Sequence, residues 1–395
     1  MGVEINATAV NRRKSNMNRE KVSQTFVMVT EIIVAQALLF PSAMKAASGT
    51  LIDLGLLHGI SSYGFGISDS GRVSGHSAGG YYAFRTAVHH ELTSHSDAGE
   101  CVHDYLTNVI SGGVTASIAY DIYQSGTAPL RVVGDCLPTS GHWQAYAYHE
   151  DPSTTPPART ARLLSEPSGA SESSARAVIS AGTGLSHVAG YATVTNRSYA
   201  CYWFVNHEGS VQFTNLGSLY LGSHTNSYAL DTDGTRHVGY YNEGSESSDA
   251  PFLISGTNVY VLNAYTPSAA LGISSSGLIA GYYVSNSITK PTFWRIIDGT
   301  MHASYLSLGS YTHGMARAVS NDGVLVGSLW NSATDEVACR WLTNGTVQTL
   351  NDIAGDIDWN MTRANNINSA AGKDTTGIMK NVNTGEVRAF MFYGW

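Results

Sequence analysis

Short stretches of alternating hydrophobic and polar residues recur along residues 50–395, and turns that contain glycine separate them. Alternation with a period of two predicts a β-strand with one buried face. One unit of this pattern has a small residue, an aliphatic residue three positions later and a glycine four positions after that, as in Ala316, Val319 and Gly323. The unit occurs seven times, and its copies begin at Gly64, Ala119, Ala175, Ser227, Ala270, Ala316 and Ala364. The seventh copy keeps the spacing but has Ala371 in place of the glycine. This regular spacing predicts a repeat fold.

Each copy predicts four antiparallel strands. The small and aliphatic residues lie on the first strand, and a second strand with its own glycine, such as Gly327, follows the tight turn. An aromatic third strand, as at residues 339–341, and a fourth strand that ends in leucines complete the unit. Four-stranded units of ~40–50 residues that repeat radially are the blades of a β-propeller. The sequence therefore predicts an all-β fold, a seven-bladed β-propeller of four-stranded antiparallel blades.

The two ends of the repeat region predict how the ring closes. Residues 390–395 have the pattern of a third strand with no fourth strand after it. Residues 51–55 have the pattern of a fourth strand with no third strand before it. We therefore expect the N-terminal strand to complete the last blade and close the ring, which protects the sheet edges there.

The first 48 residues have a different pattern. Basic residues from Arg12 to Lys21 precede an apolar stretch at residues 26–40, and small residues follow. This order is typical of a secretory signal, although Glu31 interrupts the apolar stretch. The alternatives are a buried helix or a membrane anchor, but the stretch is shorter than the ~20 residues of a membrane span. We expect residues 1–48 to be a signal peptide or N-terminal extension, residues 49–395 to be the propeller, and the protein to be extracellular or periplasmic.

Residues 50–395 resemble the HAF repeats of bacterial extracellular proteins. The likeness rests on Asp-Leu-Gly at residues 53–55, on Ile-Ser-Asp-Ser-Gly-Arg-Val-Ser-Gly-His-Ser at residues 67–77, and on Ala83 and Phe84. This resemblance implies secretion and a propeller-like repeat fold. It implies no chemistry that transfers residue by residue.

Composition narrows the range of functions. The net charge is −8 and only 13% of residues are charged, which argues against a nucleic-acid-binding protein with a broad basic face. The 22 tyrosines and 14 histidines favour a carbohydrate partner, because sugar rings stack on aromatic faces while their hydroxyls form hydrogen bonds. We expect a monomer that binds an extracellular polysaccharide, with no membrane contact beyond the signal segment.

The four cysteines carry no metal signature, because no Cys-x-x-Cys or Cys/His spacing is present. We therefore expect no cofactor, and a structural Ca²⁺ stays an open alternative. Cys201 and Cys339 fall at matching places in two copies and are predicted to pack in the core. Whether Cys101 and Cys136, in two neighbouring regions predicted to be irregular, form a disulfide stays open.

Residues 75–79 match the G-x-S-x-G motif of α/β-hydrolases. That motif needs its serine on a sharp turn between a strand and a helix. The residues after Ser77 align instead with the third strand of the other copies, and the chain lacks an alternating β/α pattern. We therefore expect no nucleophilic serine here.

Topology gives the place of a candidate site. The loops between second and third strands and the connections between blades are long and lie on one face, where binding residues concentrate. The candidate catalytic residues are His76, Tyr191, Tyr240, His224 and Arg236, and the candidate substrate-binding residues are His58, Tyr282, His313, Arg176 and Arg317. His224 and His313 both stand three positions before the small residue of their copies, so we expect them to be equivalent. The alternative for each residue is a role in packing or at the surface.

These residue types suit two functions. The first is a polysaccharide lyase that cleaves a uronic-acid polymer by β-elimination: Arg or His neutralises the carboxylate, His or Tyr takes the proton, and Tyr protonates the leaving oxygen. This hypothesis is an analogy with ulvan-type polysaccharide lyases, which are similar in being seven-bladed propellers. The second is a non-catalytic propeller that binds glycans or proteins. A hydrolase with paired carboxylates is a third alternative, but Asp231 and Asp233 are predicted to form a turn.

Overall fold

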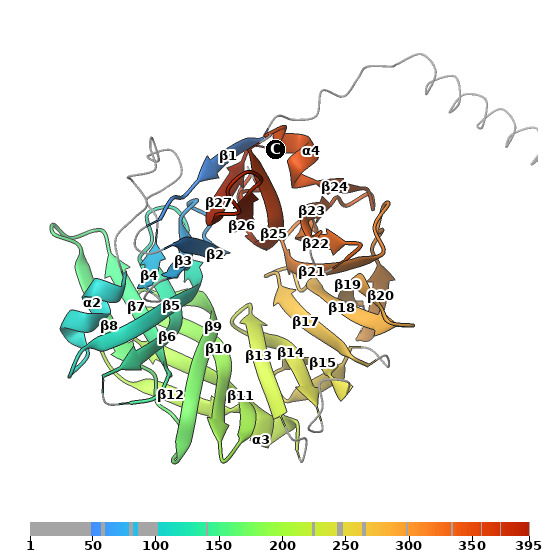
Figure 1. Ribbon diagram of the computed structural model, residues 1–395. Coiled ribbons are helices and arrows are strands. Elements are labelled where there is room, and N and C mark those ends of the chain that lie inside the picture. The colour runs from blue at the N-terminus through green and yellow to red at the C-terminus, as the bar shows by residue number, and fades with distance from the viewer. Residues whose placement is uncertain are drawn as a thin grey trace, which may run out of the picture. The chain divides into compact units, whose positions relative to one another are not determined.

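The repeats fold into antiparallel sheets made of consecutive strands (Figure 1). A computed structural model describes residues 49–56, 60–78, 82–85, 102–139, 141–222, 226–242, 248–262, 266–297, 299–332, 335–356, 358–371 and 373–394. All of them belong to one unit, Ser48–Trp395. The expected signal segment, His58, Cys101 and His224 lie outside the described residues.

Within the described residues the strands form six hydrogen-bonded sheets, and five of these have four strands each. The five sheets consist of β5 (Val114–Tyr123), β6 (Leu130–Pro138), β7 (Gln144–Asp151) and β8 (Ala158–Leu163); β9 (Ala170–Gly182), β10 (Leu185–Val194), β11 (Arg197–Asn206) and β12 (Val211–Asn215); β13 (Asn226–Thr232), β14 (Arg236–Asn242), β15 (Ala250–Ser255) and β16 (Asn258–Val261); β17 (Ser268–Ile273), β18 (Ile279–Ser285), β19 (Ile288–Ile297) and β20 (Thr300–Tyr305); and β21 (His313–Val319), β22 (Leu325–Trp330), β23 (Val337–Trp341) and β24 (Val347–Thr349). The predicted all-β class and four-stranded antiparallel units are confirmed.

The remaining sheet has seven strands because the first and last repeats share it. It contains β25 (Trp359–Ile367), β26 (Thr375–Asn381), β27 (Val387–Tyr393), β2 (Ser61–Ile67), β3 (Val73–Ala78) and β4 (Tyr82–Arg85), with β1 (Thr50–Asp53) on β27. β1 is antiparallel to β27 and Asp53 lies opposite Phe390, so the expected pairing of the N-terminal strand with the last third strand is confirmed. β2 meets β27 at one parallel pair, Ser61 with Val387, and this bridge makes the sheet count six where seven separate sheets were predicted.

The first strand of each repeat lies nearest to the centre around which the sheets are arranged (Figure 1). These strands contact one another in the order β2, β5, β9, β13, β17, β21 and β25, and β25 contacts β2. A β-bulge interrupts each of them directly after its small residue, and a bulge bends the strand and re-aims the side chain of the extra residue. The seven bulge residues are Phe65, Tyr120, Arg176, Leu230, Leu271, Arg317 and Asn365.

The glycine of each second strand pairs with the small residue of the first. A Cβ at Gly327 would lie 1.9 Å from the carbonyl oxygen of Met315, so only glycine permits this approach. In the fourth repeat Gly239 pairs with Ala229, which corrects the sequence alignment by two residues from Ser227. The spacing pattern selected the wrong frame because Leu230, the bulge residue, took the place of the expected aliphatic residue, and because the turn glycine Gly234 follows Ala229 two positions sooner than in the other copies.

This correction changes two expectations. Asp231, predicted to form a turn, lies within β13 and faces Val238 of β14. His224 stands five positions before Ala229, so its spacing no longer matches that of His313.

The hydrophobic core lies between neighbouring sheets. The third-strand residues Trp203, Trp294 and Trp341 are fully buried, and Trp294 packs with Val238 of the preceding repeat. Cys201 and Cys339 are buried free thiols in this core, as predicted. Cys136 is also a buried free thiol, and it lies in β6 and not in an irregular region.

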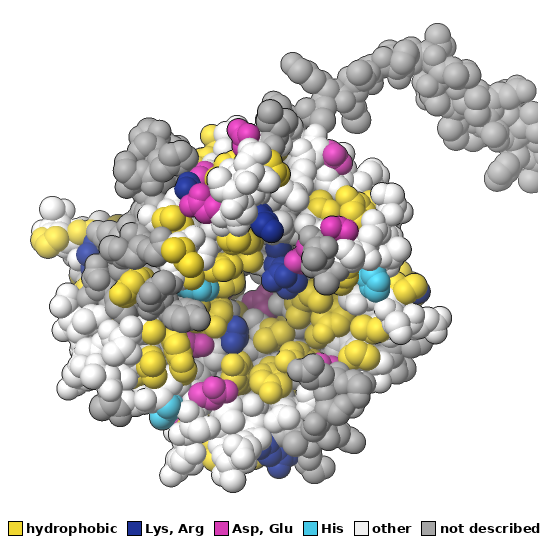
Figure 2. Space-filling view, in the orientation of Figure 1, with side chains coloured by type: hydrophobic (Ala, Val, Ile, Leu, Met, Phe, Trp, Pro, Cys, Tyr) yellow, Lys and Arg dark blue, Asp and Glu magenta, His cyan; other side chains and the backbone are white. Residues whose placement is uncertain are grey.

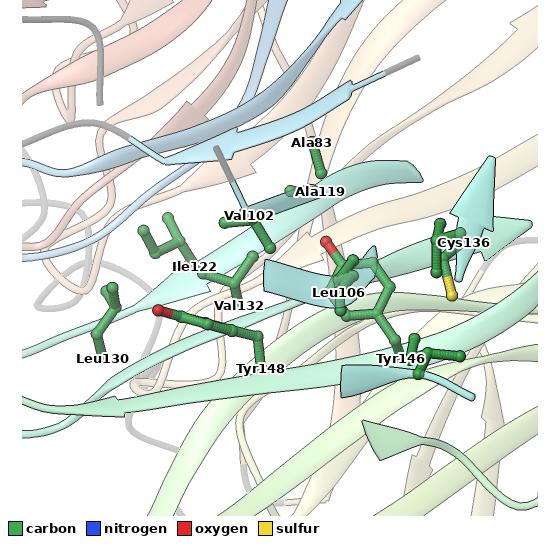
Figure 3. Close-up of a cluster of buried hydrophobic side chains, with 12 residues drawn as sticks. Ala83, Val102, Leu106, Ala119, Ile122, Leu130, Val132, Cys136, Tyr146 and Tyr148 are labelled. Atoms are coloured by element: carbon green, nitrogen blue, oxygen red, sulfur yellow. The ribbon is translucent and has the colours of Figure 1, made fainter. Parts of the chain in front are cut away.

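Three short helices among the described residues depart from the expected pattern. α2 (Val102–Val109), in a region predicted to be irregular, buries Val102 and Leu106 in a cluster with Ala83 and Tyr146 (Figure 3). α3 (Leu216–Tyr220) and α4 (Leu350–Ala354) begin where fourth strands were expected to end in leucines. Asn215 and Thr349 accept backbone N–H groups at the helix N-termini, which favours a turn of helix there.

Ser77 of the G-x-S-x-G motif is buried inside β3. It pairs with Ser62 of β2 on one side and with Tyr82 of β4 on the other. The expected absence of a strand-to-helix turn at this serine is confirmed.

Candidate functional site

Three cavities follow one another along the centre of the sheets. The inner chamber, of about 120 Å³, is lined by all seven bulge residues together with Asp121, Ala177, Asp231, Ala318 and Asn366. The mouth pocket, of about 270 Å³, is lined by Met315, Arg317, Trp330, Glu336 and Arg363. The turn-side well, of about 290 Å³, is lined by the ends of the seven first strands and by the turns that follow them. The mouth pocket is on the long-loop face that the sequence predicted, whereas the well is on the opposite face.

A wall of stacked rings stands beside the inner chamber in the first two repeats, and two of its members, Phe65 and Tyr120, line the chamber itself. His76 stacks on Tyr63 with ring centroids 4.9 Å apart and on Phe65 at 5.4 Å. Phe65 contacts Tyr120 at 5.5 Å. Burial lowers the pKa of His76 to about 4, so its imidazole is neutral at physiological pH and is a weak base.

Arg176 continues this wall in the third repeat. Its guanidinium carbon lies 3.9 Å from the centroid of the Tyr120 ring, and its Nη2 donates a hydrogen bond to Tyr191 Oη at 3.2 Å. Burial opposes its charge, but the neighbouring Tyr120 and Asp135 raise the pKa of Arg176 above its ordinary value. Burial also raises the pKa of Asp135 to about 7.

Tyrosines extend the wall through the fourth and fifth repeats. The rings of Tyr191 and Tyr228 are nearly perpendicular at 5.0 Å, and Tyr228 stacks on Tyr240 at 4.9 Å. Burial raises the pKa of Tyr240, so its phenol is protonated at neutral pH. Tyr282 contributes to the pKa shifts of both Tyr240 and Arg317, which indicates that it lies near both residues.

In the mouth pocket two arginines share one carboxylate. Arg363 Nη2 lies 2.6 Å from the Glu336 carboxylate and Arg317 Nη2 lies 3.7 Å from it. Burial, followed by the charge of Arg363, lowers the pKa of Arg317 to about 10. Trp330 forms the apolar side of the pocket and stacks on His313 with centroids 5.7 Å apart and planes 8° from parallel.

The structure therefore brings together most of the predicted site residues. Arg176 lines the chamber, and Arg317 lines both the chamber and the mouth pocket. Four others line neither cavity and reach these residues only through ring, hydrogen-bond or electrostatic contacts: His76, Tyr191, Tyr240 and Tyr282. His313 lies beside Trp330 and its Nδ1 accepts the backbone N–H of Thr289 at 3.1 Å.

Arg236 does not join this group. It lies at the far end of β14 from Tyr240, where its Nε donates to Asp233 Oδ2 at 2.5 Å and its Nη2 donates to the carbonyl oxygen of Ser275 at 3.1 Å. Arg236 therefore links the turn after β13 to the turn after β17.

Sequence reasoning missed a pair of half-buried carboxyl groups. Asp121 Oδ2 accepts the backbone N–H of Val178 at 2.8 Å, and Asp231 Oδ2 accepts that of Ile273 at 2.7 Å. Both line the inner chamber and the turn-side well. Burial raises the pKa of Asp121 to about 7; burial and the charge of Asp121 raise that of Asp231. Asp121 and Asp231 each stand two positions after the small residue of their repeat, Ala119 and Ala229. The sequence alignment did not show this match because it began the fourth repeat at Ser227.

Other missed residues flank the small residues or lie in loops. Tyr63 and Tyr228 directly precede a small residue and Tyr120 directly follows one, so a correct alignment would reveal them. Glu336 and Trp330 lie at the edges of a loop of variable length, and no spacing indicates them. No group of three or more His, Cys, Asp or Glu side chains suited to a metal ion is present in the described part of the chain. None of the helices in that part is long and apolar enough to cross a membrane.

Comparison with known proteins gives similarity to solved structures only. No protein-family model and no curated protein sequence matches the chain. Trypanosoma rangeli sialidase in complex with sialic acid has a TM-score of 0.41 at 9% identity, over 69% of this chain and 53% of that one. Pyrococcus horikoshii acylaminoacyl peptidase has a TM-score of 0.43 at 12% identity, over 82% of this chain and 51% of that one. The β-propeller domain of the Trilobed protease from Pyrococcus furiosus has a TM-score of 0.35 at 8% identity, over 71% of this chain and 94% of that one.

This chain spans about half the length of the sialidase and of the peptidase. We therefore infer its function from the geometry of the chamber and the mouth pocket.

Proposed function

We propose that residues 49–395 form a secreted, seven-bladed β-propeller that binds an acidic polysaccharide at the mouth pocket. Two observations support the blade count: the seven first strands contact one another in succession and back to the start, and their seven bulge residues line one cavity. The basic, apolar and small-residue order of residues 1–48 supports secretion.

The observation that carries the binding proposal is the combination of Trp330 with two arginines that share Glu336. One carboxylate leaves the pair with an excess positive charge, and the Arg363 side chain is 37% exposed. In our proposal the C–H face of a sugar stacks on Trp330 while the sugar carboxylate accepts hydrogen bonds from Arg363. The pocket volume of about 270 Å³ is near the lower end of ordinary ligand sites and suits one uronate residue.

Elimination by a lyase is the second candidate function. The hydrogen bond from Arg176 to Tyr191 favours it, because a guanidinium offsets the charge of a phenol oxygen that exchanges a proton with substrate. The neutral, weakly basic His76 and the protonated Tyr240 favour binding over proton abstraction. We therefore place binding first.

Calorimetric titration with polygalacturonate, alginate and neutral dextran tests the proposal. We expect the acidic polymers to bind and dextran not to bind, and Arg363→Gln and Trp330→Ala each to weaken binding by about tenfold. Tyr305→Ala, at a tyrosine that is 58% exposed, is the matched control and leaves the affinity unchanged.

Equal affinity for dextran, or unaltered binding by both variants, would refute the proposal. Ultraviolet absorbance of an unsaturated uronate product, recorded in the same mixtures, distinguishes a lyase from a binding protein. Loss of this absorbance in Tyr191→Phe would assign elimination to Tyr191, the residue to which Arg176 donates a hydrogen bond.

A further inference from the structure

Two arginines in the inner chamber carry hydrogen-bond donors for which no described residue supplies an acceptor. Arg176 and Arg317 are the bulge residues of the third and sixth repeats, and both line this one cavity. The Nε–H group of each is buried and has no hydrogen-bond partner among the described residues. A buried donor without an acceptor costs about 1–3 kcal/mol. Two such donors in one cavity indicate that a ligand supplies the acceptors.

The charges around the chamber indicate the sign of that ligand. Arg317 shares Glu336 with Arg363, so its positive charge is only partly compensated. Asp135 is the carboxyl group whose charge acts on Arg176, and burial disfavours the charged form of Asp135. Figure 2 shows basic side chains at separate places around the central hollow. An anion in the chamber would compensate both guanidinium groups.

Size and the chamber floor indicate which anion. The chamber holds about 120 Å³, which is too small for a sugar ring with its substituents but is sufficient for a carboxylate group. On its floor the carboxyl groups of Asp121 and Asp231 already accept backbone N–H groups from Val178 and Ile273. A protonated Asp121 donates a hydrogen bond to a monoanion, whereas an ionised Asp121 repels it.

We infer that the inner chamber binds one carboxylate group between Arg176 and Arg317, and that Asp121 takes up a proton when it binds. This site goes beyond the proposed mouth pocket, since Arg176 lines the chamber and not the pocket. The carboxylate belongs either to a free small acid or to the end residue of a uronide chain.

The protonation step fixes the pH dependence. The charged and titratable groups that line the chamber are Tyr120, Asp121, Arg176, Asp231 and Arg317. Burial places the pKa of Asp121 at about 7, and a bound anion raises it further. Affinity for the carboxylate is therefore greatest below neutral pH and declines as the pH rises through that range.

Calorimetric titration of the purified protein with sodium acetate at constant ionic strength tests the inference. We expect one saturable site, and a loss of affinity of about tenfold or more in Arg176→Gln and in Arg317→Gln. Arg295→Gln is the matched control, because Arg295 is exposed on β19 and changes the charge equally. Titration of the unaltered protein in two buffers of different ionisation enthalpy gives the proton uptake, and this measurement needs no variant to fold.

Three outcomes would overturn the inference: acetate binding that does not saturate, affinity unchanged in both arginine variants, or binding without proton uptake. A short oligogalacturonide distinguishes the two sources, because Arg176→Gln weakens it only if the chain end enters the chamber. If the mouth-pocket proposal alone fails, polygalacturonate binding is insensitive to Arg363→Gln and Trp330→Ala while acetate binding persists.

Discussion

The half-buried Asp121 gives a stability prediction that can be worked out from the structure. In the folded chain burial raises its pKa from 3.8 to about 7, so the folded state binds this proton more tightly than the unfolded state. The contribution of this carboxyl to stability is therefore intact below about pH 4, falls as the pH rises, and reaches its minimum above about pH 7. At about 1.4 kcal/mol for each pKa unit, the loss is at most about 4 kcal/mol.

Asp121→Asn removes this penalty. The amide oxygen still accepts the backbone N–H of Val178, and the amide fills nearly the same volume. We expect the variant to match the original protein near about pH 4 and to exceed its free energy of unfolding by about 2–4 kcal/mol near about pH 8.

Urea unfolding followed by circular dichroism at several pH values measures this difference. Asp358→Asn is the control, because Asp358 is exposed and its substitution is not expected to alter the pH dependence. A difference between variant and original that is independent of pH would refute the reasoning, because it would show that Asp121 is ionised in the folded state throughout.

Three further predictions concern the framework. Gly327→Ala places a Cβ 1.9 Å from the carbonyl oxygen of Met315, so we expect the melting temperature to fall by several degrees, and an unaltered value would contradict the close approach of β21 and β22. Arg388→Gln removes the hydrogen bond of 2.6 Å to Asp53, so we expect about 1 kcal/mol less stability and faster amide exchange in β1, with exchange in β17 as the internal control. In a Cys101→Ala variant the three remaining thiols are buried, and we expect them to react with a thiol reagent only after denaturant is added; rapid reaction of the native protein would contradict their burial.

Much of the fold follows from the sequence because each repeat must bury the same positions. Small first-strand residues recur in each repeat and most third strands carry aromatic residues, which made Ala316 and Trp341 identifiable as core residues. The fourth repeat was misaligned because the spacing pattern fits Ser227, Leu230 and Gly234, whereas the strand pairing of Gly239 with Ala229 shows that Leu230 is the bulge residue.

The candidate site was harder to predict than the fold. Residues directly after second-strand glycines lie close to the chamber without lining it, as Tyr191 does beside Arg176, because strand geometry fixes their position. The bulge residues were not recognised as a set, because a bulge depends on hydrogen bonding between strands and leaves no period in the sequence. Glu336 lies in a loop between strands, and its contact with Arg363 depends on tertiary packing alone.

The pairing of β1 with β27 has a consequence for the order of assembly. Asp53 and Arg388, which hold the two strands together, are 335 positions apart in the chain. The seam between them therefore forms only after the ribosome has delivered Arg388, whereas each earlier sheet consists of strands that follow one another in the chain. Until that moment both margins of the shared sheet are open to other chains, so crowding during synthesis or transport is the stage at which this protein is most vulnerable to aggregation.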